Sequence, residues 1–271
     1  SAFMSVDSVV LGGELLQGTA LDLTAANGVW TIDRFETHLP GATDLRAAGD
    51  VTTKAGKPGF SGAVALTAGD LPNLLRWLEG GLAGRRPAGL PRQLSLTGQL
   101  TADAGHYAVD DLALNADGEE LAGRLDYRVP TGEPPTIVAA LRSSGLDADR
   151  LQIARLVRLA GGDGMQNLGA ARLALTFQAS RLTWGGVTAH GIDLDLRRQG
   201  GKFDVRKLKV ADLDGAAVEA HGTLSLANDH PTGNFSASID AQSINGIIAA
   251  LRAGGVPAGF ADALAARASV L

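Results

Sequence analysis

Apolar and polar residues alternate along most of the chain, and this period of two predicts β-strands. Residues 21–24, 172–177 and 192–197 each place an apolar side chain at every second position. One face of the resulting sheet is therefore apolar and the other is wet. This pattern is typical of an antiparallel sheet with one solvated side, because strands of a parallel sheet are buried on both faces and read as continuous apolar runs.

The alternating pattern recurs in three copies, which argues for one structural unit repeated along the chain. Each copy contains a glycine, an aromatic residue two positions later and a β-branched aliphatic residue two positions after that. The segments are 28–35, 105–112 and 201–208. In each copy these residues are followed by a turn glycine, an aliphatic residue and a second glycine. These positions are Gly41, Leu45 and Gly49; Gly118, Leu121 and Gly123; and Gly215, Val218 and Gly222.

The apolar phase slips by one residue inside each aromatic strand. A β-bulge at this point would return the later apolar residue to the inner face and would add curvature to the sheet. We therefore expect three bulges, located between Ile32 and Phe35, Val109 and Leu112, and Val205 and Leu208.

Each copy ends in a short pattern of helical period. Asp70, Asp147 or Asp149, and Ser243 stand where an N-cap belongs, and paired glycines follow the last apolar residue at 80–81, 161–162 and 254–255. The repeats span residues 19–82, 94–164 and 170–255. A unit of about four strands and one helix cannot enclose its own apolar face, so neighbouring units must pair edge to edge.

The fold expected from these patterns is mainly β. It is an elongated, curved antiparallel sheet of roughly twelve to fifteen strands, taco-like or an open-barrel groove, built from three repeats of about four strands plus a short helix. Residues 1–271 form a single elongated repeat domain, which we interpret as a fragment of a larger protein because both ends of the chain resemble incomplete units.

Composition narrows the functional classes. With 271 residues, 45% hydrophobic residues and a net charge of −5, the chain has the composition of a globular protein, and a nucleic-acid partner is not expected. There are 36 glycines, which indicates many turns, and no cysteine, which excludes disulfides and thiolate metal sites.

No apolar stretch is long enough to span a bilayer, and the start lacks the pattern of a signal peptide. The chain is thus either cytosolic or a piece separated from its targeting segment.

Catalytic motifs are not found in the sequence. The five histidines show no zinc spacing, and the adjacent pairs Asp110-Asp111 and Glu119-Glu120 point to opposite faces of a strand and so cannot share a substrate. No phosphate-binding or nucleophile-elbow motif is present. We expect no catalytic residue, no metal site and no cofactor. Arg85, Arg86 and Arg92 form a basic cluster, which we interpret as a solvated loop in preference to a site for phosphate headgroups.

The order of the motifs resembles that of the AsmA-like proteins of Gram-negative envelopes. The resemblance rests on Leu-x-Leu alternations with glycine turns, including segments 21–30, 39–49, 60–62, 96–98 and 121–125, and it covers most of the chain. It implies a long periplasmic β-sheet body attached to the inner membrane by a helix that this chain lacks. It also implies an apolar groove and a role in moving phospholipid between the inner and outer membranes and in outer-membrane assembly. Membrane contact would come through segments outside this chain.

A lipid groove needs an unbroken strip of apolar side chains, with every second residue of each strand contributing. The partner would be a phospholipid or another acyl-chain ligand, with envelope proteins as further partners. The candidates for this inner face are Leu21, Leu23, Trp30, Ile32, Tyr107, Val109, Leu112, Leu173, Leu175, Phe177, Leu194, Leu196, Phe203 and Val205.

Two other functions remain open at this point. The same inner face would also serve as a filled core in a solid-packed structural module that docks envelope proteins through its open edges, without binding lipid. A carbohydrate-acting repeat domain is the third alternative. Such a domain needs a row of exposed aromatic residues and carboxylates, and three tryptophans and two tyrosines scarcely supply one.

Overall fold

A computed structural model gives the structure of residues 2–11, 14–26, 29–54, 56–78, 90–151, 171–225 and 232–253, and all statements below concern these described residues. The fold is mainly β, as expected, with an open antiparallel sheet whose strands follow one another in chain order. The chain divides into two compact units, Ser1–Thr131 and Gly132–Leu271, and the boundary lies inside the second predicted repeat.

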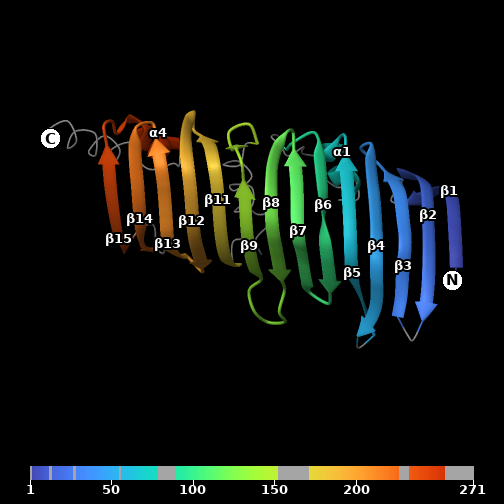
Figure 1. Cartoon of the computed structure of the whole chain (residues 1–271). Coiled ribbons are helices and arrows are strands. Elements are labelled where there is room, and N and C mark those ends of the chain that lie inside the picture. The colour runs from blue at the N-terminus through green and yellow to red at the C-terminus, as the bar shows by residue number, and fades with distance from the viewer. Residues whose placement is uncertain are drawn as a thin grey trace. The chain divides into compact units, whose positions relative to one another are not determined.

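Unit 1 is a meander of eight antiparallel strands with one described helix (Figure 1). Few residues separate successive strands along the chain, except that α1 and residues 79–93 stand between β5 and β6. The elements are β1 (Ala2–Leu11), β2 (Glu14–Ala26), β3 (Val29–Leu39), β4 (Thr43–Lys54), β5 (Lys57–Ala68), α1 (Leu71–Leu78), β6 (Leu94–Asp103), β7 (His106–Ala116) and β8 (Glu119–Arg128).

Unit 2 contains seven strands and one described helix (Figure 1). All of its neighbouring strands pair antiparallel except that β11 pairs parallel with both β9 and the two-residue strand β10. The elements are β9 (Thr136–Ser143), β10 (Leu146–Asp147), β11 (Arg172–Trp184), β12 (Val187–Gln199), β13 (Lys202–Leu213), β14 (Ala216–Ser225), β15 (Thr232–Ala241) and α4 (Asn245–Ala253).

The parallel pair corrects the expectation of a purely antiparallel sheet, and its cause is one additional strand. In the first copy the aromatic strand is β3, which is the second of the four strands β2 to β5. In the third copy the aromatic strand is β13, which is the third of the five strands β11 to β15. Since β12 to β15 correspond to β2 to β5, β11 is the addition. It enters beside the start of β9, at Arg172 opposite Thr136, and so runs in the same direction as β9.

All three predicted bulges are present. The pairing register shifts between Ile32 and Phe35, between Val109 and Leu112, and between Val205 and Leu208. A repeat glycine faces each bulge from the next strand, at Gly49, Gly123 and Gly222.

These glycines are required because their backbone has positive φ, at 157°, 146° and 153°. A Cβ added at Gly49 would also lie 2.4 Å from the Ser61 carbonyl oxygen, and one at Gly222 would lie 2.3 Å from that of Asn234. Only glycine permits so close an approach of two strands. The second glycine of the repeat therefore belongs to the bulge.

The described helix starts agree with the predicted caps. The Asp70 carboxylate accepts a hydrogen bond from the Asn73 amide at the start of α1 (3.3 Å), and the Ser243 hydroxyl accepts one from the Asn245 amide at the start of α4 (3.2 Å). Asp147 likewise accepts from the Arg150 amide (2.8 Å), which is where the second helix was expected to begin. The body of that helix and the three glycine stops lie outside the described residues.

Candidate functional site

The pairing register identifies one apolar face in unit 1. Residues directly opposite each other on neighbouring strands project to the same side, as do residues two apart on one strand. The resulting rows of described residues contain no charged side chain. The rows are Ala25, Trp30, Val51, Phe60, Ala102, Tyr107 and Tyr127; Leu23, Ile32, Gly49, Gly62, Leu100, Val109 and Leu125; Leu21, Phe35, Ala47, Val64 and Gly98; and Thr37, Leu45, Leu66, Leu96, Leu114 and Leu121.

Unit 2 has an apolar face of the same kind. Its rows are Ile137, Leu173, Arg198, Phe203, Leu224 and Gly233; Ala139, Leu175, Leu196, Val205, Gly222 and Phe235; Leu141, Phe177, Leu194, Leu208, Ala220 and Ala237; and Ser143, Ala179, Ile192, Val210, Val218 and Ile239.

Each apolar face has two different ends. The helix end of unit 1 is buried, because α1 packs there: Ala68 is 1%, Leu74 3% and Leu71 8% exposed. At the helix end of unit 2, Ile247 and Ile248 of α4 are buried in the same way. Helices thus cover the end of the face where the strands meet them.

The opposite end, which we call the aromatic end, is open among the described residues. Trp30 is 52% and Tyr107 50% exposed, although both point to the apolar face. The rings of Tyr107 and Tyr127 stack with their centroids 6.4 Å apart. In unit 2, Leu224 and Phe235 are also exposed. An apolar face of this extent left open to solvent is uncommon in a monomeric soluble protein and typically marks a binding surface.

All fourteen candidate residues lie on these two apolar faces, and thirteen of them stand in the rows given above. The remaining one, Leu112, follows the bulge of β7 and is opposite Gly123. It is 7% exposed and is the one buried member of the set, while the others are half-buried or exposed.

Two surface depressions are lined mainly by polar-face residues. One of about 500 Å³ in unit 1 is lined by polar-face residues of β3 to β7, among them Glu36, Arg46 and Gln99. A second, of about 390 Å³ in unit 2, is lined by Arg172, Arg197 and other residues at the ends of β11, β12 and β13. Most of the lining residues belong to the polar face, but the linings also include Phe35, Ala47, Val64 and Gly98 of the unit 1 rows and Leu173 and Arg198 of the unit 2 rows.

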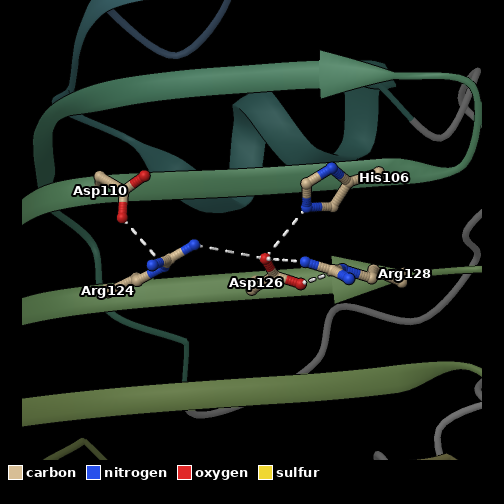
Figure 2. Close-up of polar contacts among 5 residues, drawn as sticks. All are labelled: His106, Asp110, Arg124, Asp126 and Arg128. Atoms are coloured by element: carbon tan, nitrogen blue, oxygen red, sulfur yellow. Dashed lines mark hydrogen bonds and ion pairs between the residues drawn. The ribbon is translucent and has the colours of Figure 1, made fainter.

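The polar face of unit 1 carries a charge network behind the aromatic end (Figure 2). Asp126 of β8, 4% exposed, accepts hydrogen bonds from Arg128 (Nε to Oδ1 2.9 Å, Nη2 to Oδ2 3.2 Å) and is paired with His106 of β7 (Nε2 to Oδ2 3.0 Å). Arg124 lies 3.6 Å from the same carboxylate and 2.9 Å from Asp110.

The network keeps Asp126 ionised. Burial raises the pKa of this carboxyl, but the hydrogen bonds and charges of Arg128 and His106 outweigh burial and leave the pKa below its ordinary value. An ionised carboxylate that is hydrogen-bonded to the guanidinium of its own strand and to an imidazole of the next strand is suited to joining the two strands. No sequence pattern predicts this network, because only the strand register brings residues 106, 126 and 128 together.

Other predicted features are located as follows. Asp110 pairs with Arg124, and the adjacent Asp111, exposed at the bulge with a φ of 51°, lines the polar-face depression of unit 1, so the expected placement of the two carboxylates on opposite faces is wrong because both are bulge residues. Arg85 and Arg86 of the basic cluster lie outside the described residues, and Arg92 is exposed.

Within the described ranges there is no group of three or more His, Cys, Asp or Glu side chains suited to a metal. No described helix has the length and apolar character needed to cross a membrane.

Comparisons with protein-family models, with curated proteins and with solved structures give no match for this chain. The functional argument therefore rests on the apolar faces and on the sequence resemblance.

Proposed function

We propose that the chain is a non-enzymatic, periplasmic segment of an AsmA-like protein that binds or conducts phospholipid along its apolar faces. The observation that carries the proposal is the open aromatic end: side chains as large as Trp30 and Tyr107 stand half-exposed on a face whose neighbouring rows contain no charge. An acyl chain laid on such a face removes apolar surface from water on both partners.

The energy available is sufficient for binding. Burial of a methylene group contributes about 0.8 kcal/mol, so about fourteen methylenes would supply about 11 kcal/mol before the entropy of binding is subtracted. A face open on one side recovers only part of this sum, while the ester groups and headgroup remain in water.

The experiment is native mass spectrometry of the purified chain after exposure to phospholipid vesicles. We expect lipid adducts on the wild type and fewer on Leu175→Asp and Leu194→Asp, which place a charge in the middle rows of the unit 2 apolar face. Asp193→Asn and Thr176→Asp change polar-face positions on β12 and β11 and are the matched controls. Circular dichroism checks that each variant is folded. A folded wild type without lipid adducts would contradict the proposal.

A second candidate is the docking module without bound lipid, and strand β15 favours it. All ten residues of β15 are exposed, including Phe235 at 57% and Ile239 at 45%. A strand of this kind can pair with a strand of another protein. In the same experiment this candidate predicts a folded chain that carries no lipid.

A further inference from the structure

Strand β15 is an edge strand of unit 2 and pairs with β14 alone among the described residues (Figure 1). All ten of its residues are exposed, and its pairing with β14 runs over the whole strand without a bulge. Edge strands of soluble proteins are commonly protected by lysine, proline, a bulge or a short length. β15 has none of these features, and its single charged residue, Asp240, stands next to last. Its outer edge is therefore suited to pair with a further strand.

The described part of the chain after β15 turns away from this edge. Helix α4 returns across the end of the sheet, where a Cβ added at Gly246 would lie 2.6 Å from the Cβ of Asp214, between β13 and β14. The same helix contacts β12 and buries Ile247 and Ile248. The described residues that follow β15 thus leave its outer edge open.

One hydrogen bond determines which backbone groups of β15 point outward. The backbone amide of Gln242 donates to the carbonyl oxygen of Gly215 (3.1 Å), one step beyond the last register pair of β14 and β15. In an antiparallel ladder, hydrogen-bonded pairs alternate with pairs that are not bonded to each other. The even-numbered residues of β15 are therefore bonded to β14, and the odd-numbered residues direct their N–H and C=O groups to the open edge. The outward residues also belong to the apolar face and are Gly233, Phe235, Ala237, Ile239 and Ala241.

The sequence of β15 is complementary to itself when Ala237 of one copy lies opposite Ala237 of a second copy. In this register Phe235 of each copy faces Ile239 of the other. Pairs of an aromatic and a β-branched residue across two strands stabilise a sheet, and this pair occurs on both sides of the two-fold axis. On the polar face Asn234 lies opposite Asp240, so its amide can donate to the carboxylate and no like charges face each other.

Other registers of the same strand fit less well. A register that places an even-numbered residue at the axis, or opposite an odd-numbered one, is excluded because the even-numbered backbone groups are already bonded to β14. Among the odd-numbered centres, Ala237 pairs the stretch 233–241 of both copies, whereas a centre at Phe235 or Ile239 leaves a shorter overlap. The backbone and the side chains therefore select the same register.

Charge favours unit 2 over unit 1 as the site of self-association. Unit 1 has 10 basic and 16 acidic residues, whereas unit 2 has 14 basic and 13 acidic residues. Two copies of unit 2 therefore approach each other with little repulsion. In the edge strand of unit 1, β1, the charged residue Asp7 stands near the middle, where it protects the edge.

We infer that the chain forms a two-fold symmetric dimer through the open edge of β15, with Ala237 of both copies at the axis. Each copy contributes the same strand, so the contact is isologous and closed. Residues opposite each other in a ladder project to the same side, so the apolar face of unit 2 continues across the axis into that of the second copy. The dimer forms without lipid and goes beyond the proposed function.

Disulfide cross-linking tests the register, because the chain has no cysteine of its own. The Cα atoms of a hydrogen-bonded antiparallel pair are about 5.5 Å apart, a separation that a disulfide can span. On mild oxidation of the full chain, we expect Ala237→Cys to dimerise at least about tenfold faster than Ser236→Cys, which would lie opposite Ser238. Phe235→Cys alone should not cross-link, whereas a mixture of Phe235→Cys and Ile239→Cys should.

Sedimentation velocity over a range of protein concentrations, without lipid, measures the dimer itself. We expect the wild type to show a monomer–dimer equilibrium. Ala237→Lys places like charges opposite each other at the axis and should raise the dissociation constant at least about tenfold. Met4→Lys, at a 51% exposed position of the other edge strand β1, is the matched control and should leave the equilibrium unchanged. Circular dichroism checks that each variant is folded.

A folded wild type that stays monomeric at high micromolar concentration would overturn the dimer. A dimer that is as tight in Ala237→Lys as in the wild type would also overturn it, as would equal cross-linking of Ala237→Cys and Ser236→Cys. The cysteine variants each change one exposed side chain, so they test the register independently of how well Ala237→Lys folds. Lipid adducts are measured separately, so failure of the dimer leaves the proposed function intact.

Discussion

The two ends of the apolar face in unit 1 share one sequence pattern but have different environments. At the helix end, α1 packs over Ala68 of β5 and leaves it 1% exposed, whereas at the aromatic end Trp30 remains 52% exposed. The alternation that forms the strands is the same at both ends. What differs is the covering element, which shows that alternation specifies an apolar face without specifying whether the face becomes a core or a binding surface.

The two ends are also stabilised differently. The helix end is held by burial of aliphatic side chains between α1 and the sheet. The aromatic end lacks such a cover among the described residues, and its strands β7 and β8 are joined on the opposite, polar face by His106, Asp126 and Arg128. Stability at one end is therefore hydrophobic, and at the other it depends on charge.

The largest expected effect is at the helix end. Leu74→Ala would remove a 3% exposed side chain from the contact between α1 and the sheet, and we expect a loss of about 2–5 kcal/mol in the free energy of unfolding. Urea denaturation followed by circular dichroism measures it. Leu78→Ala, on the same helix but 62% exposed, is the control and is expected to change the free energy by less than about 1 kcal/mol. Equal losses in the two variants would refute the assignment of this end as core.

The network at the aromatic end gives a smaller, pH-dependent effect. Asp126→Asn leaves the cationic partners without their carboxylate, and we expect a loss of about 1–3 kcal/mol at pH 7. Because the pKa of Asp126 is lowered by folding, its contribution is fully present above its ordinary value of 3.8 and is lost as the pH falls through the folded-state pKa. The unfolding free energies of wild type and variant should therefore converge below about pH 4.

Asp111→Asn is the matched control for this effect. Asp111 is exposed, and asparagine tolerates its positive φ as well as aspartate does. We expect its unfolding free energy to follow that of the wild type at every pH. A constant difference between Asp126→Asn and the wild type from pH 7 to pH 3 would argue against an ionised, stabilising Asp126.

Local features of the fold were predictable because they have local causes. A one-residue slip in an alternating strand has few solutions, so the bulges at Ile32, Val109 and Val205 could be located from the sequence. The parallel pairing of β11 could not be predicted, because β11 alternates in the same way as its antiparallel neighbours and does not read as a continuous apolar run.

The candidate site was predictable only in outline. The alternation selected residues such as Leu23 and Leu196 for one face, but it did not show that Trp30 and Tyr107 are open to solvent, because exposure depends on what covers the sheet. Arg198 was missed for a related reason. It follows the three alternating apolar positions Ile192, Leu194 and Leu196 and interrupts the apolar pattern, and only the register with Phe203 places it on the apolar face.

The central claim is that acyl chains lie against the open aromatic end of the apolar face. Quenching of tryptophan fluorescence by phospholipids brominated on their acyl chains measures this contact directly. Two variants with a single tryptophan suffice. The first retains Trp30 and has Trp77 and Trp184 changed to Phe, and the second retains Trp77 and has Trp30 and Trp184 changed to Phe. The account predicts strong quenching of Trp30 and little quenching of Trp77, a residue of α1 that packs against the core at the helix end. Equal quenching of both, or none at Trp30 in a folded protein mixed with lipid, would contradict it.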